Sequence, residues 1–453
     1  KIKNYGTMNI LIIGAGEVGY QLTRQLAPQK HNIIILEKDP ARAHRAEEQL
    51  DALIITGNGS SFQDLKKAKI EDTDILAAIS NDDEVNLMAC RYAQKLKIPH
   101  KIARVRNPEF IEEDFILTRE ELGVDVLIHP EKETADAIVR LIRQSSATDI
   151  IEFAGGNIQM VGIRLERNSP ILNKTLQEIW KEYGNLDARI VAINRKEKTI
   201  IPSGNDSLIP GDQIFVICDK KLIPEIARIT GKENVSIQNI MILGGGLIGR
   251  YVARALENEL NIKIIESRSE KSEEIADILQ KTLVIHGDGT DMDLLAVEGI
   301  IDMDSFIAVT GDDETNIIST LMARHLQVPR TIALVNKTEY LPITPTIGMD
   351  AVVSKKLLTV NAIIRFIQRS TLESIASIPG VDAEILEIIP KDNSKITKKP
   401  LKDINFPRSA IVGAVQRDTE IIIPTGDTRI NSGDRVVVFA LMASLSEVEK
   451  LFN

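Results

Sequence analysis

A glycine-rich segment occurs twice in this chain of 453 residues, in a fixed register. GAGEVG at residues 14–19 returns as GGGLIG at residues 244–249, an offset of 230 from Gly14 to Gly244. Each copy lies between a short apolar run and an amphipathic helical pattern, which is the setting of a dinucleotide-binding motif. The chain is therefore expected to fold around two nucleotide-binding units.

Two further segments repeat at the same offset. GNGS at residues 57–60 returns as GDGT at residues 287–290, and SNDDE at residues 80–84 returns as TGDDE at residues 310–314. Because these companions keep the register, the sequence indicates duplication of a whole unit. Nothing with catalytic character separates the copies, which favours a sensor over an enzyme.

Short apolar, β-branched runs alternate with longer helical stretches in the first part of the chain. We expect strands near residues 8–13, 33–37, 52–56, 74–79, 100–105 and 124–128. These runs are apolar throughout, so they are expected to be buried on both faces, as in a parallel sheet covered by helices. The pattern predicts an α/β fold with a doubly wound, Rossmann-like domain.

A different pattern follows each Rossmann-like unit. Strand-like segments at residues 158–165, 188–194, 199–202 and 213–218, with helices at 174–183 and 222–229, predict a small α+β domain. The second half repeats the plan. The expected domains are residues 8–145 (Rossmann-like), 146–232 (small α+β), 237–372 (Rossmann-like) and 373–453 (small α+β), and residues 1–7 are expected to be an expression remnant.

One helix is expected to contact more than its own sheet. The segment after Pro130 carries Ala137, Ile138, Leu141 and Ile142 at helical spacing. This apolar face predicts a crossover or dimer-contact helix.

The glycine motifs suggest how a ligand would be held. The first glycine permits a tight turn, the second lets a pyrophosphate approach the backbone, and the third allows close helix packing. The phosphates would lie at a helix N-terminus, where unpaired N–H groups and the helix dipole favour an anion. The candidate residues in the two motifs are Gly14, Gly16, Glu17, Val18, Gly19, Gly244, Gly246, Leu247, Ile248 and Gly249.

An acidic residue is expected at the end of the second strand of each unit. Glu37 and Glu266 lie 21 and 20 residues past the middle glycines, where a carboxylate can accept hydrogen bonds from a ribose diol. Such a carboxylate repels a 2′-phosphate, so NAD(H) or an adenosine nucleotide is preferred over NADP(H). Arg268 weakens this preference in the second copy, and the alternative for both carboxylates is a solvated charge at a strand end.

Other candidate residues follow the strands at the same edge of each sheet. The remaining predicted site residues are Lys38, Asn58, Ser80, Asn81, Arg104, Ser267, Asp288, Thr310 and Gly311. Asp82, Asp83, Asp312 and Asp313 could cap helices or bind a cation, and capping is favoured. Arg104 could clamp phosphates or pair with a carboxylate, but its counterpart Leu334 cannot. The two sites are therefore expected to differ in affinity or in preferred nucleotide.

Composition and charge exclude several other functions. The net charge of −10 argues against nucleic acid bound through a broad basic face. Cys90 and Cys218 stand far apart in apolar patterns, which fits a reducing, cytoplasmic setting, and no apolar run approaches the roughly 20 residues of a membrane span. The six histidines show no metal-ligand spacing, so a metal site is not expected.

The chain resembles the TrkA-type cytosolic regulators of bacterial potassium uptake, which have two tandem domains that regulate potassium conductance. The resemblance rests on both glycine motifs, Glu37, Glu266, the GNGS and GDGT segments, DDEVN at residues 82–86, DDETN at residues 312–316 and ARVR at residues 103–106. It covers essentially all of the chain from Met8.

This resemblance implies a peripheral subunit on the inner face of the cell membrane. It implies assembly as a homotetramer beneath a TrkH-type integral membrane potassium channel, with NAD(H) and ATP or ADP competing for the Rossmann-like sites. Gating would follow from unequal ligand affinity for two ring conformations. The alternatives are an NAD-dependent oxidoreductase, which needs an acid–base residue near the cofactor, and a scaffold that binds no nucleotide.

Overall fold

A computed structural model describes most of the chain, and its packing forms two compact units. The described residues are 8–27, 31–112, 114–183, 187–196, 198–232, 236–344, 347–369, 374–378 and 381–453, so the predicted remnant at residues 1–7 lies outside them. Of the described residues, those within 1–133 and 355–372 form the first unit, and those within 134–354 and 373–453 form the second.

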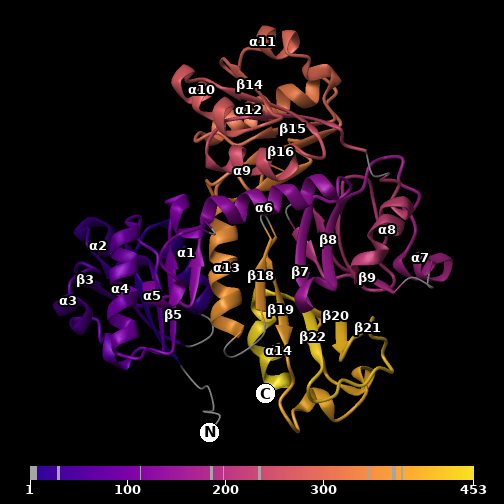
Figure 1. Ribbon diagram of the computed structural model, residues 1–453. Coiled ribbons are helices and arrows are strands. Elements are labelled where there is room, and N and C mark those ends of the chain that lie inside the picture. Colours follow the sequence, from indigo (N-terminus) through magenta and orange to yellow (C-terminus); the bar gives the residue numbers. More distant parts are fainter. Residues whose placement is uncertain are drawn as a thin grey trace. The chain divides into compact units, whose positions relative to one another are not determined.

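The first unit holds a parallel sheet, which lies at the indigo end of the colour scale in Figure 1. Its strand order is β3-β2-β1-β4-β5-β6. This is the Rossmann order, so the predicted fold class is confirmed here. The strands are β1 (Asn9–Ile13), β2 (Asn32–Glu37), β3 (Leu53–Thr56), β4 (Ile75–Ala78), β5 (His100–Arg104) and β6 (Val126–Ile128). The helices between them are α1 (Glu17–Leu26), α2 (Pro40–Gln49), α3 (Phe62–Lys67), α4 (Asp83–Lys95) and α5 (Arg119–Leu122).

The central strands of this sheet are buried on both faces. Every side chain of β4 is buried, as are Leu11, Ile12 and Ile13 of β1. Leu11 and Ile13 pack in one core with Leu76, Ala89 and Cys90. Burial on both faces explains why these strands are apolar throughout.

A helix from the second half of the sequence also packs in the first unit. Helix α13 (Lys355–Arg369) follows the last strand of the second Rossmann-like sheet, yet it contacts α1, and the two lie side by side in Figure 1. His100 and Phe366 make an edge-to-face ring contact with centroids 5.9 Å apart. The sequence assigns residues 355–369 to the second Rossmann-like domain, whereas their packing groups them with the first.

The second unit contains a sheet that repeats the topology of the first, in the order β14-β13-β12-β15-β16-β17. The strands are β12 (Asn239–Leu243), β13 (Asn261–Glu266), β14 (Leu283–His286), β15 (Ser305–Ala308), β16 (Arg330–Leu334) and β17 (Ala351–Val353). The helices are α9 (Leu247–Leu256), α10 (Ser269–Ile278), α11 (Met292–Val297) and α12 (Asp313–His325). The predicted second Rossmann-like domain is therefore also confirmed as a fold.

Two antiparallel five-stranded sheets form the small α+β domains, with the orders β10-β9-β11-β8-β7 and β18-β19-β22-β20-β21. The first contains β7 (Asp149–Phe153), β8 (Ile158–Arg164), β9 (Ala188–Arg195), β10 (Lys198–Ile200), β11 (Gln213–Asp219), α7 (Leu176–Tyr183) and α8 (Ile223–Ile229). The second contains β18 (Ser374–Ser377), β19 (Ala383–Ile388), β20 (Ala410–Arg417), β21 (Glu420–Ile422), β22 (Arg435–Leu441) and α14 (Leu445–Phe452). The sequence did not predict edge strand β7.

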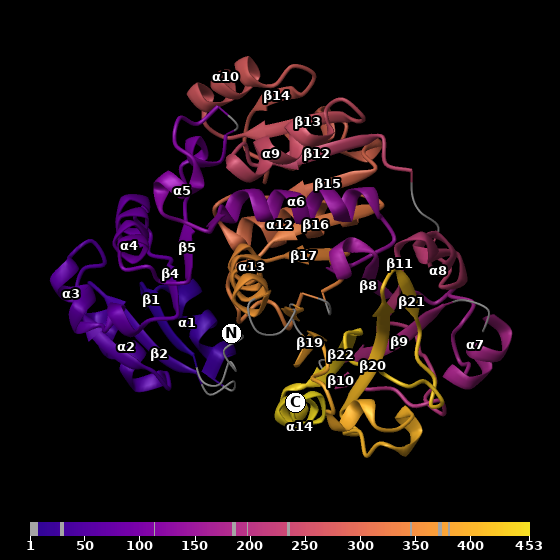
Figure 2. The ribbon, with the colours of Figure 1, turned by 60° about the horizontal axis from the view of Figure 1, so that its bottom comes forward.

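The two small domains share one hydrophobic core. Phe215 of β11 and Phe439 of β22 are fully buried and stack with ring centroids 6.4 Å apart. Strands β9 and β20 lie next to each other (Figure 2). Arg189 of β9 donates hydrogen bonds to the carbonyl oxygens of Val412, at 3.3 Å, and Pro424. The small domains therefore form a single packed body.

Helix α6 (Pro130–Arg143) crosses the division between the units, because the second unit begins at Thr134. Ile138, Leu141 and Ile142 are buried, and Arg143 Nη2 lies 2.9 Å from Glu259 Oε1. The residues of α6 from Thr134 onward thus pack within the second unit, and a role as a crossover or dimer-contact helix stays a prediction.

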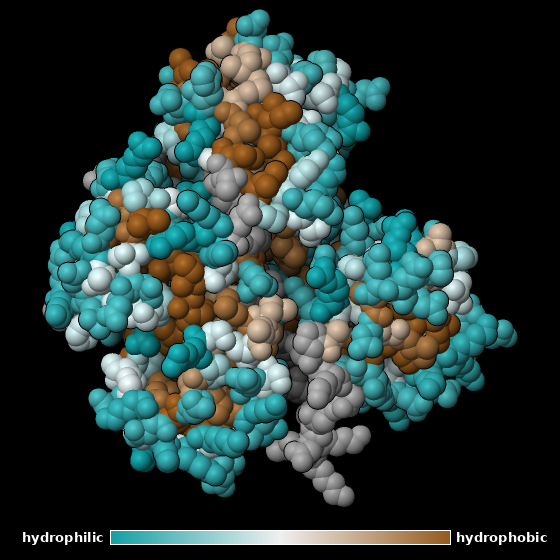
Figure 3. All heavy atoms as spheres, turned by 180° about the vertical axis from the view of Figure 1, so that it is seen from behind, coloured by the Kyte–Doolittle hydropathy of each residue, from teal (hydrophilic) through white to brown (hydrophobic). Residues whose placement is uncertain are grey.

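The surface is mixed in polarity. The face drawn in Figure 3 is largely hydrophilic, with hydrophobic patches between the polar residues. Among the described helices, none combines the length and the apolar character needed to cross a bilayer.

Candidate nucleotide-binding sites

The two glycine turns have the same geometry, and the first and third glycines are required by the fold. Gly14 and Gly244 have φ angles of +104° and +105°, a region that side chains other than glycine rarely adopt. A Cβ atom on Gly19 would lie 2.0 Å from the Gly14 carbonyl oxygen, and one on Gly249 would lie 2.1 Å from that of Gly244. These four glycines close the turns and let α1 and α9 approach them.

The middle glycines are not required by the fold. Gly16 and Gly246 have φ angles of −67° and −64°, which any residue can adopt, and a Cβ atom on either would meet nothing within 4 Å. Both are N-cap residues, and no side chain caps α1 or α9 there. The open space and the free helix N-terminus fit a phosphate group. Val18 and Ile248 are buried behind each turn.

Glu37 faces the first glycine turn instead of solvent. Its Oε2 accepts a hydrogen bond from the Ala15 N–H at 2.6 Å, and its Oε1 accepts one from the Asp39 N–H at 2.9 Å. The residue is 5% exposed. This geometry argues against a solvated strand-end charge and leaves a lone pair on each oxygen for a ribose hydroxyl. Lys38 is exposed.

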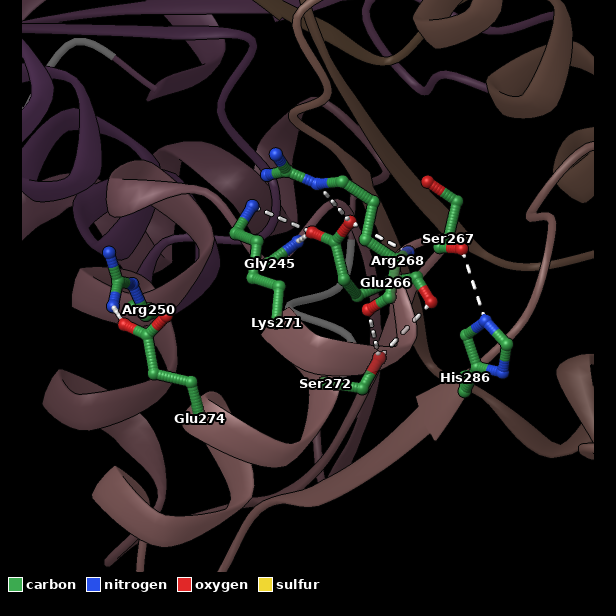
Figure 4. Close-up of polar contacts among 9 residues, drawn as sticks. All are labelled: Gly245, Arg250, Glu266, Ser267, Arg268, Lys271, Ser272, Glu274 and His286. Atoms are coloured by element: carbon green, nitrogen blue, oxygen red, sulfur yellow. Dashed lines mark hydrogen bonds and ion pairs between the residues drawn. The ribbon is translucent and has the colours of Figure 1, made fainter.

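Glu266 has the same place in the second copy, but two cations surround it (Figure 4). Its Oε2 accepts from the Gly245 N–H at 3.1 Å and from Lys271 Nζ at 2.7 Å, while Arg268 Nε lies 3.4 Å from Oε1. Burial acts to raise the pKa of Glu266, but Lys271 and the hydrogen bonds hold it below the ordinary value. A ribose at Glu266 must therefore compete with Lys271 and Arg268.

The exposed residue Ser267 follows Glu266. His286 Nε2 lies 3.1 Å from the Ser267 carbonyl oxygen, so the ring contacts backbone rather than another side chain of the site (Figure 4).

Buried asparagines explain the repeated DDEVN and DDETN segments. Asn86 Oδ1 accepts from the Ser80 N–H at 2.9 Å and from the Ser80 hydroxyl at 2.8 Å, and Asn86 Nδ2 donates to the Arg104 carbonyl at 2.9 Å. Asn316 makes the equivalent contacts with Thr310 and with the Leu334 carbonyl. Ser80 and Thr310 are thereby fixed at the sheet edge. The sequence identified both asparagines as motif residues without assigning this role.

The acidic residues beside these asparagines have structural partners. Asp82 and Asp312 cap α4 and α12 by accepting from the Val85 and Thr315 N–H groups, so the favoured capping role is confirmed for both. Asp83 Oδ2 accepts from the N–H groups of Arg106 and Asn107, and Asp313 Oδ2 does the same with Asn336 and Lys337. Within the described residues, no group of three or more potential metal ligands is present.

Asn58 and Asp288 shape their own turns. Asn58 Oδ1 accepts from both the N–H and the hydroxyl of Ser60 at 3.0 Å, and Asp288 Oδ1 accepts from the same groups of Thr290. These contacts hold the turn after the third strand, so a ligand contact from either side chain remains a prediction.

Arg104 ends β5 in the first site and is almost fully buried. Its Nη1 donates to Asn81 Oδ1 at 2.9 Å, and its Nε has no hydrogen-bond partner among the described residues. Burial lowers the pKa of the guanidinium, and the charge of Glu131 opposes this effect. Its direct partner is thus an amide rather than a carboxylate.

Two lysines of α13 bring further charge to the first site, and the sequence did not identify them. Lys356 Nζ lies 2.5 Å from Oε2 of Glu17, the first residue of α1. Lys355 Nζ lies 3.1 Å from Glu131 Oε1. The same oxygen atom lies 3.9 Å from Arg106 Nε. The signal in the sequence is that Lys355 and Lys356 in the second copy stand where the first copy has Pro130 and Glu131. This difference acquires a meaning only through the packing of α13 on α1.

These paired units define a class of protein. A TrkA-N domain matches residues 10–130 and 240–355, and a TrkA-C domain matches residues 160–231 and 385–453. The chain is thus a tandem protein with two TrkA-N and two TrkA-C domains.

Full-length relatives give the family. The chain is 36% identical to the Trk system potassium uptake protein TrkA homolog 2 of Methanosarcina mazei, over 98% of this chain and 100% of that protein. It is 33% identical to the Trk system potassium uptake protein TrkA of Azorhizobium caulinodans, over 98% and 99%. The chain belongs to the TrkA family, so the resemblance seen in the sequence is confirmed. This is a family of potassium uptake proteins and not of enzymes.

Solved structures share the fold. The structural match with the GsuK RCK domain spans 100% of this chain and 96% of the GsuK chain, with a TM-score of 0.60 at 19% sequence identity. The GsuK channel bound to NAD gives a TM-score of 0.61 at 20% identity, over 100% of this chain and 80% of its own.

Proposed function

We propose that this protein is a regulatory subunit of a Trk-type potassium uptake system and that its two Rossmann-like sites bind NAD(H) and the competing ligands ATP and ADP. The observation that carries the proposal is the open backbone at Gly16 and Gly246. Neither position needs glycine for its conformation or packing. A phosphate that must contact the backbone gives glycine a reason to be there.

The surrounding residues support this assignment. Glu37 and Glu266 would hold the adenosine ribose, and the N-terminal N–H groups of α1 and α9 would hold phosphates. Arg104 supplies a buried guanidinium at the first site, and no described residue accepts a hydrogen bond from its Nε–H. The similarly folded GsuK has been solved bound to NAD and bound to ADP, which supports both ligand classes.

The partner in this proposal is a TrkH-type integral membrane channel, with the protein a cytoplasmic subunit peripheral to the membrane. The relatives are named as Trk system proteins, which supports a transport partner. We further propose a homotetramer. Exposed apolar residues recur in register on both copies, with Leu53 and Leu283 on edge strands and Met88 and Ile318 on α4 and α12, and such repeated exposure favours self-association.

Regulation would arise from unequal affinity of each nucleotide for two conformations of the ring, since a ligand that binds both equally shifts nothing. Phosphates drawn onto the α1 N-terminus would move the elements that pack on α1, and the ring would pass this change to the channel.

The proposal can be tested with a TrkH-type channel in potassium-loaded proteoliposomes. We expect the added wild-type protein to change potassium flux differently with NADH, ADP and ATP. G16D together with G246D should abolish the nucleotide response, because each aspartate puts a carboxylate where phosphate would bind and can cap its helix. A nucleotide response that persists in the double variant would contradict the proposal.

A further inference from the structure

The first site contains an ion pair between the two halves of the sequence. Lys356 Nζ on α13 and Glu17 Oε2 on α1 are 2.5 Å apart, and their side chains are 17% and 71% exposed. Glu17 directly follows Gly16, the open N-cap position. The ammonium group of Lys356 therefore lies beside the helix N-terminus at which a phosphate would be held.

The Glu17 carboxylate places a negative charge of the protein itself at this helix N-terminus. A carboxylate in the first turn of α1 is stabilised by the helix dipole, and Lys356 neutralises it. A phosphate at Gly16 would be repelled by Glu17 and attracted by Lys356. Because Glu17 is largely exposed, its carboxylate can turn toward solvent while the half-buried lysine stays at the site.

The same sheet edge carries other cations. Arg104 ends β5, its buried Nε has no hydrogen-bond partner among the residues that the structure describes, and Arg106 comes two residues later. Lys355 Nζ is 3.1 Å from Glu131 Oε1. Arg106 and Lys355 both face the Glu131 carboxylate, which is buried. Lys356 faces Glu17 instead, and it becomes available to an incoming anion when the exposed Glu17 carboxylate turns toward solvent.

The two residues of this ion pair are not repeated in the second copy of the sequence. Leu247 stands where the first copy has Glu17, at the offset of 230. Strand β17 begins 225 residues after β6, at Ala351 against Val126. Helix α13 likewise begins 225 residues after α6, at Lys355 against Pro130. At that offset Glu131 is the counterpart of Lys356, so the sequence keeps neither residue of the ion pair in the other copy.

We propose that Lys356 is a specificity-determining residue of the first site, where it binds the terminal phosphate of ADP or ATP in exchange for Glu17. This inference rests on the proposed nucleotide binding. A terminal phosphate carries more charge than the doubly esterified phosphates of a dinucleotide, so a lysine point charge favours ADP and ATP over NAD(H). The ligand would then be held by α1 from the first half of the chain and by α13 from the second.

The test is calorimetric titration of the full chain carrying G246D, so that only the first site reports. Adding K356M should weaken ADP binding about tenfold or more, as for loss of a charge-assisted hydrogen bond, and NADH binding less than threefold. K356R should restore ADP binding, and E17Q should tighten it. K402M is the matched control, because Lys402 forms a 2.5 Å ion pair with Asp427 in the second small domain, and it should change nothing.

Each outcome is decisive. Unchanged ADP affinity in K356M, or an equal loss of ADP and NADH affinity, overturns the assignment while leaving the proposed nucleotide binding intact. If the G246D parent binds neither ADP nor NADH, nucleotide binding at the first site fails, and the role of Lys356 fails with it.

Discussion

Arg104 Nη1 donates a hydrogen bond to Asn81 Oδ1 at 2.9 Å, and both residues are replaced in the second copy of the unit. Leu334 stands in place of Arg104, and Gly311 in place of Asn81. The buried guanidinium and the amide that orients it are therefore lost together. The ion pair of Lys356 with Glu17 and the cations around Glu266 add to this asymmetry.

Replacing Arg104 should weaken nucleotide binding at the first site only. In the G246D background, we expect R104M to reduce ADP affinity about tenfold, since a charged hydrogen bond contributes about 1.5–3 kcal/mol. L334M in the G16D background is the matched change at the second site and should leave affinity unchanged. Calorimetric titration measures both. Equal losses at the two sites would show that Arg104 has no special role.

Asn86 should be important for stability as well as for the site. It is fully buried and bonds both Ser80 and the Arg104 carbonyl. We expect N86A to lower the free energy of unfolding of the first unit by about 2–4 kcal/mol, because it leaves buried polar groups unpaired. N316A should have a similar effect on the second unit, whereas N58A, at an exposed turn, should cost less than about 1 kcal/mol. Urea unfolding followed by circular dichroism measures these free energies. An equal loss in N86A and N58A would contradict the role of Asn86.

The stacked pair of Phe215 and Phe439 should hold the two small domains together. Truncation by F439A removes a fully buried ring from their shared core, and we expect a loss of about 3–5 kcal/mol. M442A, at a position that is 40% exposed, is the control. Thermal unfolding distinguishes them, and equal melting temperatures for F439A and M442A would refute the importance of the shared core.

Glu384 should make stability depend on pH. Burial, together with the charge of Glu449, raises its pKa from 4.5 to about 7. The folded state then binds more protons than the unfolded state between these values, so stability should fall as the pH rises from about 4.5 to about 7. E384Q removes a penalty of up to about 3 kcal/mol at pH 8 and should be nearly neutral at pH 4.5. Urea unfolding at the two pH values tests this, and an equal effect at both would count against it.

The repeated sheets could be predicted from the sequence because their strands are buried on both faces. Segments such as residues 75–78 are apolar throughout, and short apolar runs between helical patterns are typical of buried parallel strands. The packing of α13 in the first unit could not be predicted. Helical periodicity identifies an apolar face on residues 355–369, but not which sheet will cover it. Strand β7 was missed because a short edge strand with Asp149 and Glu152 lacks a clear alternation.

The residues of the candidate sites that depend on local geometry could be predicted from the sequence, whereas those brought in by long-range packing could not. Gly14 and Gly19 are needed by local geometry, and the acidic residue after the second strand has a fixed place in the motif. Lys356 was missed because its contact with Glu17 joins residues far apart in the sequence, and only the packing of α13 on α1 brings them together.

The most direct test of nucleotide sensing is calorimetric titration of ADP, ATP and NADH into four full-length proteins: wild type, G16D, G246D and the double variant. We predict two binding sites of unequal affinity in the wild type, one in each single variant and none in the double variant, with all four proteins folded alike by circular dichroism. The account would be contradicted if the double variant bound nucleotide with the affinity of the wild type, or if the wild type bound none.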